Sequence, residues 1–90
     1  MERIIEVGKL YHHFKGHKYI VRAIAYDSEK YHEDDKETSR VVVYEDIERN
    51  IYWVRPYDMF NSLVDREKYP NIKQKYRFEE IRKEDINESK

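Results

Sequence analysis

The sequence predicts a small, mainly β domain, and three observations support this prediction. Apolar, β-branched and aromatic residues are concentrated in short runs, of which 19–26, 40–46 and 51–55 are the clearest. Polar or glycine-containing segments separate these runs and predict turns. Ninety residues provide one hydrophobic core. We therefore expect an SH3-like, partly closed β-barrel with one short helical turn, and the alternative is a small α+β open antiparallel sheet.

The first two strands are expected on either side of a turn at Gly16. The segment "RIIEVGKLYHHF" is typical of an opening strand that Gly8 could break, and "FKGHKY" supplies the turn because glycine accepts positive φ. In the next strand, 19–26, alternate side chains point to opposite faces. One face is expected to carry Tyr19, Val21, Ala23 and Ala25, and the other Ile20, Arg22, Ile24 and Tyr26.

The segment "IYWVRPYDMF" contains the only tryptophan and predicts a strand that leads into a helical turn. Alternation places Ile51, Trp53 and Arg55 on one face of this strand. Pro56 ends the strand because it has no N–H to donate. The following "YDMFNSLV" has apolar residues at helical spacing, so we expect one or two helical turns that bury Met59 and Phe60. A last strand is expected in "YRFEEI".

The chain is expected to form one domain over residues 1–81, followed by a charged and frayed tail over 82–90. The acidic segment 27–38 is read as a solvated hairpin loop. Its carboxylates are oxygen ligands of the kind that hard cations prefer, but it lacks glycine and the spacing of a calcium loop. We therefore predict no metal site there and no cofactor.

Composition narrows the possible functions. The formal net charge of −1 gives no overall basic field for nucleic acid, although a local basic patch is compatible with it. The absence of cysteine excludes a disulfide framework, a thiolate nucleophile and a Cys-ligated zinc. The opening "MERIIEVGKL" carries charges and no long apolar run, so neither a signal peptide nor a membrane span is expected. These features predict a cytoplasmic protein without a membrane partner.

Several blocks occur in a recognisable order, namely "GKLYHHFKG", "YIVRAIAYDSE", "VVVYED", "YWVRPYDMF" and "YRFEEI". Together they resemble domain-of-unknown-function family 1653, a family of small bacterial proteins. The resemblance covers almost the whole chain except about the last ten residues. It implies that His13, rather than His12, belongs to the shared pattern, and it marks the acidic insert before "RVVVY" as longer than usual. The family carries no settled activity.

The histidines are the first candidates for chemistry. His13 could act as a general base near neutral pH, with Ser28, Glu29 or Tyr44 as its partner, which would make the protein a hydrolase. His13 and His17 could also meet across the turn and bind a metal, but spacing specifies no third ligand. The chain has only two glycines, no phosphate loop and no nucleophile elbow. We therefore favour a protein that is not an enzyme, and we assign no catalytic or metal-binding residue.

The aromatic residues and Arg55 support a binding function. Trp53 either fills the core or forms an exposed platform, and Arg55 either pairs with Asp58 or Glu29 or recognises an anion. The leading hypothesis is a binding module for a planar or anionic ligand, such as a nucleobase, a nucleotide, RNA or a peptide. Its ligand-binding residues would be His13, Phe14, Tyr44, Trp53, Arg55 and Met59. The alternative is a structural or protein–protein interaction domain that forms a homo-oligomer.

Overall fold

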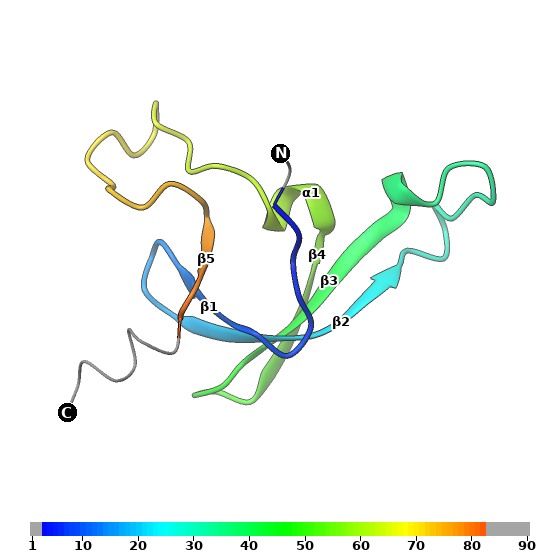
Figure 1. Ribbon diagram of the computed structural model, residues 1–90, viewed down its shortest axis with the longest axis horizontal. Helices are drawn as coiled ribbons and strands as arrows, with labels where there is room; N and C mark the ends of the chain where they lie inside the picture. The colour runs from blue at the N-terminus through cyan, green and yellow to red at the C-terminus, as the bar shows by residue number, and fades with distance from the viewer. Residues whose placement is uncertain (1–2, 83–90) are drawn as a thin grey trace.

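Five antiparallel strands form one sheet in the computed structural model, which describes residues 3–82 (Figure 1). The strands are β1 (Leu10–His13), β2 (Lys18–Tyr26), β3 (Arg40–Asp46), β4 (Ile51–Pro56) and β5 (Phe78–Glu80). A 3-10 turn, η1 (Glu37–Ser39), precedes β3, and one turn of helix, α1 (Tyr57–Phe60), follows β4. The strand order is β4-β3-β2-β1-β5.

The predicted mainly β class is confirmed, and the open antiparallel sheet describes the fold better than the barrel. β4 and β5 are the two edges of the sheet and do not pair with each other. β5 has only three residues and already pairs with β1. It therefore has few backbone groups left to pair with β4 and close the sheet into a barrel. Figure 1 shows the curved sheet with α1 and the segment before β1 lying inside its curve. These two segments fill the interior that a closed barrel would have enclosed.

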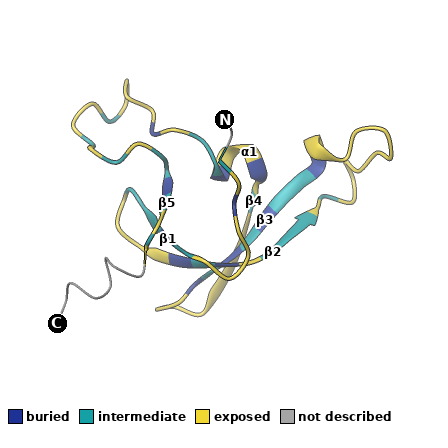
Figure 2. Cartoon of the chain, in the orientation of Figure 1, coloured by how far each residue is buried: buried dark blue, intermediate teal, exposed yellow. Residues whose placement is uncertain are grey.

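The core lies between the concave face of the sheet and α1. Figure 2 shows that buried residues lie on the strands and on α1, while the long loops are largely exposed. At its centre the Phe60 and Phe78 rings are stacked with centroids 4.0 Å apart, and Tyr44 meets both rings at steep angles. Aromatic side chains give this small domain a large buried apolar area for each residue. The cluster consists of Ile5, Tyr11, Tyr19, Val21, Val42, Tyr44, Tyr57, Phe60 and Phe78.

A β-bulge at Arg22 overturns part of the predicted alternation in β2. Val21 pairs with Tyr44, but the next paired residue is Ala23, opposite Val43. The extra residue exchanges the two faces, so Ile24 joins Val21 on the core side and packs against the core. Ala23 and Ala25 therefore do not share a face with Tyr19 and Val21, contrary to the expectation from strict alternation.

The predicted opening strand is shorter than expected. Only Leu10–His13 forms β1, and Gly8 adopts a φ of +88°, which breaks the extended chain before it. The segment before Gly8 is instead held across the core by buried tyrosines. The Ile5 amide donates to the Tyr57 hydroxyl at 2.9 Å, and the Glu6 amide donates to the Tyr11 hydroxyl at 3.1 Å. Burial without a partner would have been unfavourable for these hydroxyl groups.

The short helix α1 buries Phe60 but not Met59. Phe60 is fully buried, whereas Met59 is 46% exposed, so the expectation that both residues enter the core was wrong for Met59. The physical reason is the length of the helix: in one turn only Tyr57 and Phe60, three residues apart, face the sheet. The expected short helical element is confirmed as a single turn, and the chain leaves the helix at Asn61.

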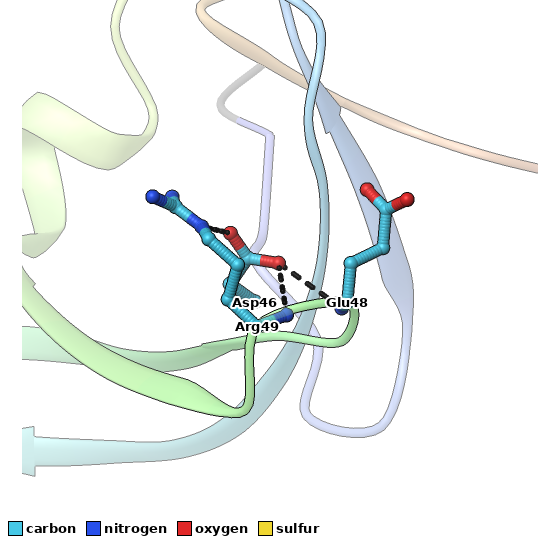
Figure 3. Close-up of polar contacts among 3 residues, drawn as sticks. All are labelled: Asp46, Glu48 and Arg49. Atoms are coloured by element: carbon cyan, nitrogen blue, oxygen red, sulfur yellow. Dashed lines mark hydrogen bonds and ion pairs between the residues drawn. The ribbon is translucent and has the colours of Figure 1, made fainter.

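The turn between β3 and β4 is fixed by Asp46, whose side chain is buried (Figure 3). Its carboxylate accepts hydrogen bonds from the amides of Glu48 and Arg49 and from Arg49 Nε, the last at 2.6 Å. The Arg49 hydrogen bond holds the pKa of Asp46 below its ordinary value. Asn50 completes the turn with a φ of +57°. This turn sets the register in which Trp53 lies opposite Tyr44.

The expected tail over 82–90 lies outside the described residues except for Arg82. Among residues 3–82, neither helical element approaches the length and apolar character that crossing a membrane requires.

Candidate functional site

Trp53 and Arg55 lie on the core-facing side of β4, as the alternation predicted. Trp53 pairs with Tyr44 and Arg55 pairs with Val42, two residues that are buried on that face. Because β4 is an edge strand, with no further strand beside it among residues 3–82, Trp53 stays 42% exposed and Arg55 is half-buried. The two side chains are therefore accessible together on one face.

Trp53 and Arg55 line a hollow of about 250 Å³, which we call the aromatic hollow. The buried rings of Tyr44 and Phe78 lie 5.4 Å apart and belong to its lining. Among the residues that the structure describes, the lining contains one lysine, one arginine and no carboxylate. The complete lining is His13, Lys15, His17, Tyr19, Tyr44, Trp53, Arg55 and Phe78.

Arg55 is held at the margin of this hollow by an aromatic environment. Its Nε donates a hydrogen bond to the Tyr44 hydroxyl at 3.1 Å, and its guanidinium carbon lies 5.6 Å from the centroid of the Phe78 ring. None of the ion pairs found within residues 3–82 involves Arg55. The expected alternatives of a pair with Asp58 or Glu29 are thus not realised in that part of the chain.

A second hollow of about 270 Å³ adjoins the first, and we call it the cationic hollow. It lies between the β1–β2 turn and the loop 64–75, which closes at its base through a bridge between Leu63 and Tyr76. The two hollows share His13, Lys15 and Arg55. The complete lining of the cationic hollow is His13, Phe14, Lys15, Arg55, Asp65, Lys68, Tyr69 and Arg77.

The loop 64–75 is positioned by contacts with β1 and with the turn that follows it. Phe14 and Tyr69 meet edge to face at 4.9 Å, and Lys15 Nζ lies 5.3 Å from the Tyr69 ring. Gln74 donates from Nε2 to the carbonyls of His12 at 3.0 Å and Tyr76 at 2.8 Å, and its Oε1 accepts from His12 Nδ1. These bonds satisfy backbone groups that a loop would otherwise leave to water.

His13 lies where the two hollows meet, with its ring 4.7 Å from both Phe14 and Phe78. Nδ1 accepts a hydrogen bond from the Lys15 amide at 3.0 Å, so the neutral ring carries its proton on Nε2. Burial, and then the positive charges of Arg55 and Lys15, lower the pKa of His13 to about 4. The imidazole is therefore neutral at neutral pH.

The proposed catalytic partners of His13 do not assemble around it. Ser28 and Glu29 follow the far end of the nine-residue strand β2, whereas His13 lies beside its first residues. Neither residue lines the aromatic or the cationic hollow. Tyr44 does line the aromatic hollow, but its hydroxyl accepts the hydrogen bond of Arg55. Across residues 3–82, no three His, Asp or Glu side chains form a group that could hold a metal ion.

Five of the six expected site residues come together in this region. His13, Tyr44, Trp53 and Arg55 line the aromatic hollow, and Phe14 lines the cationic hollow. Met59 is the exception, because it lines neither hollow and is exposed on α1.

Sequence reasoning missed the contribution of the loop 64–75 and of Arg77. The lining residues outside the expected set are Asp65, Lys68, Tyr69 and Arg77 in the cationic hollow, His17, Tyr19 and Phe78 in the aromatic hollow, and Lys15 in both. From its sequence alone, the polar segment "DREKYPNIKQK" predicts only a linker or hairpin. Tyr69 was the one residue in this segment that indicated a contact with the rest of the protein, since an aromatic side chain in a polar loop commonly packs against the body of the domain.

The fold defines the protein as a small, mainly β domain with an open five-stranded sheet. Residues 9–80 match the model of the family described as "Protein of unknown function (DUF1653)", and the chain belongs to this family. The resemblance drawn from the sequence blocks is thereby confirmed. No curated protein and no solved structure matches the chain. Every residue that lines the two hollows lies within the matched range.

Proposed function

We propose that the protein is a non-catalytic binding module whose ligand combines a planar ring with negative charge. One observation carries the proposal: Trp53 and Arg55 lie side by side on β4 and line one accessible hollow. A planar group and an anion are the two partners that an indole face and a guanidinium fork recognise best.

The planar part of the ligand is assigned to Trp53. Its indole lines a hollow that also contains aromatic rings, yet it is not packed into the core. Stacking of a base on an exposed aromatic side chain contributes about 1–3 kcal/mol to binding. An exposed tryptophan also contributes less to folding than a buried one, so a binding role accounts for its position better than stability does.

The negative charge of the ligand follows from the residues that line the aromatic hollow. Arg55 and Lys15 are cationic, and no carboxylate lies among the lining residues. An aromatic cage for a methylated lysine or another cation relies on electrostatic attraction to the cation, which these two charges oppose. An anionic ligand is attracted by both.

Binding, rather than catalysis, fits the chemistry of His13. With its pKa lowered to about 4, the imidazole is a weak base at neutral pH. Within residues 3–82 no serine lines either hollow, and the one carboxylate, that of Asp65 in the cationic hollow, accepts a hydrogen bond from the Glu67 amide.

The single tryptophan makes the test direct, because intrinsic fluorescence reports on Trp53 alone. The wild-type chain is titrated with adenosine monophosphate, uridine monophosphate, a tetranucleotide of RNA and an acidic tetrapeptide. Saturable quenching by at least one of these probes is expected. If none of them changes the fluorescence or the amide chemical shifts of residues 13–15 and 53–55, the proposal fails.

A second candidate function, self-association, is favoured by the exposed edge of the sheet. On the face of β4 opposite Trp53, Tyr52 is 60% exposed and Val54 is 63% exposed. An unprotected edge strand with apolar side chains is a template for pairing with another strand. Analytical ultracentrifugation separates the candidates: a stable dimer that buries Trp53 replaces the binding-module proposal, whereas a monomer removes the second candidate.

A further inference from the structure

We infer that the cationic hollow is a second subsite of the same ligand site and that it takes the phosphate of a nucleotide whose base lies against Trp53. This inference rests on the proposed function and deepens it, because it names the ligand class. It also assigns a role to Lys15, Lys68 and Arg77, none of which the sequence analysis placed in the site.

The two hollows are neighbours with three lining residues in common, so a ligand that extends past these side chains can reach both. His13, Lys15 and Arg55 line each of them. Each hollow, at about 250 and 270 Å³, is slightly smaller than the ~300–1,000 Å³ of pockets that hold a whole small molecule. Each therefore suits one chemical group of a ligand, which is the division between base and phosphate in a nucleotide.

The cationic hollow concentrates positive charge that no ion pair found within residues 3–82 neutralises. Its lining includes four cationic side chains and one carboxylate, in a chain whose formal net charge is −1. None of the four takes part in the ion pairs found within residues 3–82. The carboxylate of Asp65 accepts a hydrogen bond from the Glu67 amide and belongs to its own turn. The four cations are Lys15, Arg55, Lys68 and Arg77.

The number and kind of donors favour a phosphate over a carboxylate. A single arginine satisfies a carboxylate through two parallel hydrogen bonds. Two arginines and two lysines around one hollow supply more donors than that, and a phosphate has additional oxygens to accept them. Burial, and after it the charges of Arg55, Lys15 and Arg77, lower the pKa of the His13 ring beside this hollow.

Two aromatic rings of the cationic hollow position the ammonium group of Lys15. Phe14 and Tyr69 line the cationic hollow with Lys15 Nζ near both rings, at 5.8 and 5.3 Å. These contacts hold the ammonium group beside the hollow, and they leave it without a carboxylate in salt-bridge distance within the described part of the chain. A free nucleotide and a nucleotide within single-stranded nucleic acid present the same chemistry to such a site.

The experiment measures adenosine, adenosine monophosphate and a tetra-adenylate RNA against the full wild-type chain, by Trp53 fluorescence and calorimetry. Adenosine monophosphate is expected to bind at least about tenfold more tightly than adenosine, since the phosphate adds charge-assisted hydrogen bonds. Lys68→Gln is expected to weaken binding of the monophosphate about tenfold and to leave adenosine unchanged. Lys73→Gln, which removes a cation from the same loop outside both hollows, is the matched control and should change neither.

Arg77→Lys provides a second variant. It is needed because a neighbouring cation could take over the role of Lys68 in the Lys68→Gln variant and mask its loss. Its folding is checked by the amide spectrum before binding is measured. Tighter binding of the tetranucleotide than of the monophosphate supports the inference and identifies single-stranded nucleic acid as the source. Equal binding of the two supports it with a free nucleotide as the source.

The failures of the inference and of the proposed function are distinguishable. If adenosine and its monophosphate quench Trp53 with equal affinity, and neither variant changes this, the phosphate subsite is wrong while the aromatic site stands. If only an acidic peptide binds, the nucleotide class is wrong. If no probe binds, both proposals fall together.

Discussion

The guanidinium of Arg55 donates a hydrogen bond from Nε to the hydroxyl of buried Tyr44 at 3.1 Å. This bond joins a residue of the edge strand β4 to a residue of the core strand β3, and it holds Arg55 where the two hollows meet. Because Nε makes the bond, the two terminal nitrogens remain as donors for a ligand. The relationship leads to a specific prediction for each partner.

Tyr44→Phe removes the hydroxyl that orients Arg55 and keeps the ring in the core. We expect adenosine monophosphate to bind about 2- to 10-fold more weakly, because the hydrogen bond that orients the charged guanidinium is lost while the guanidinium itself is kept. Arg55→Lys keeps the charge but removes the planar fork, and we expect a loss of about tenfold or more. Calorimetry measures both affinities. Unchanged affinity in Tyr44→Phe would show that the hydrogen bond does not position Arg55 for binding.

Trp53 and Tyr52 form a matched pair, because they are neighbours on β4 with opposite orientations and comparable accessibility. Trp53→Ala is expected to weaken binding of the monophosphate about 5- to 150-fold, which corresponds to the ~1–3 kcal/mol of a stacked base. Tyr52→Ala is expected to leave the affinity unchanged. Calorimetry is required here, since Trp53→Ala abolishes the fluorescence signal. Equal losses of affinity in the two variants would indicate that both substitutions disturb β4 in general, and would contradict stacking of the base on Trp53.

His13 makes folding stability depend on pH in a defined direction. Its pKa of about 4 in the folded protein is lower than the ordinary value of 6.5, so the unfolded chain binds more protons between these values. The contribution of the neutral ring to stability is therefore complete above about pH 6.5 and is lost as the pH falls toward 4.

Denaturant unfolding of the wild type and of His13→Gln at pH 7, 5.5 and 4 tests this expectation. Carboxylates contribute to both proteins in the same way, so only the difference between the two pH profiles reports on His13. We expect the wild type to lose more stability than the variant between pH 7 and pH 4. Parallel profiles would contradict the lowered pKa.

Phe60 and Met59 are neighbours on α1 with opposite environments. Phe60 is fully buried against Phe78, while Met59 is exposed. Phe60→Leu is expected to lower the free energy of unfolding by about 1–3 kcal/mol, because the stacked ring is replaced by a smaller side chain in a packed core. Met59→Ala is expected to change it by less than about 0.5 kcal/mol. Urea unfolding curves measure both values, and a comparable loss in Met59→Ala would contradict this assignment of faces.

The strands of this fold were predictable because their side-chain period is a local property. The runs that predicted β2, β3 and β4 match the observed bounds to within one residue, and Gly16 adopts the positive φ expected of the turn. Two features depended on tertiary structure instead. The bulge at Arg22 interrupts no sequence pattern, since the residues after it are apolar on both faces. The length of α1 is the second feature, because the apolar spacing allowed one or two turns and only one turn forms.

Only the part of the candidate site that lies on the strands was predictable from the sequence. Alternation alone placed Trp53 and Arg55 on one face, and the edge position of β4 then left both accessible. The cationic hollow was not predictable, because it depends on how the loop 64–75 folds back on the β1–β2 turn. Hydrogen bonds between distant residues determine that path, and the separation of Gln74 from His12 by 62 positions in the sequence is an example.

Gln74 therefore offers a test of whether the loop forms part of the site. Gln74→Ala removes the hydrogen bonds to the His12 and Tyr76 carbonyls, and we expect a loss of about 1–2 kcal/mol in unfolding free energy. Since Lys68 and Tyr69 are carried by this loop, adenosine monophosphate should bind more weakly while adenosine binds as before.

Amide hydrogen exchange of the Gln74→Ala variant should become faster in residues 64–75 and stay unchanged in β3. Lys73→Ala, an exposed neighbour in the same loop, is the control and should alter none of these measurements. A Gln74→Ala variant with faster exchange but full affinity for the monophosphate would place the phosphate outside the cationic hollow.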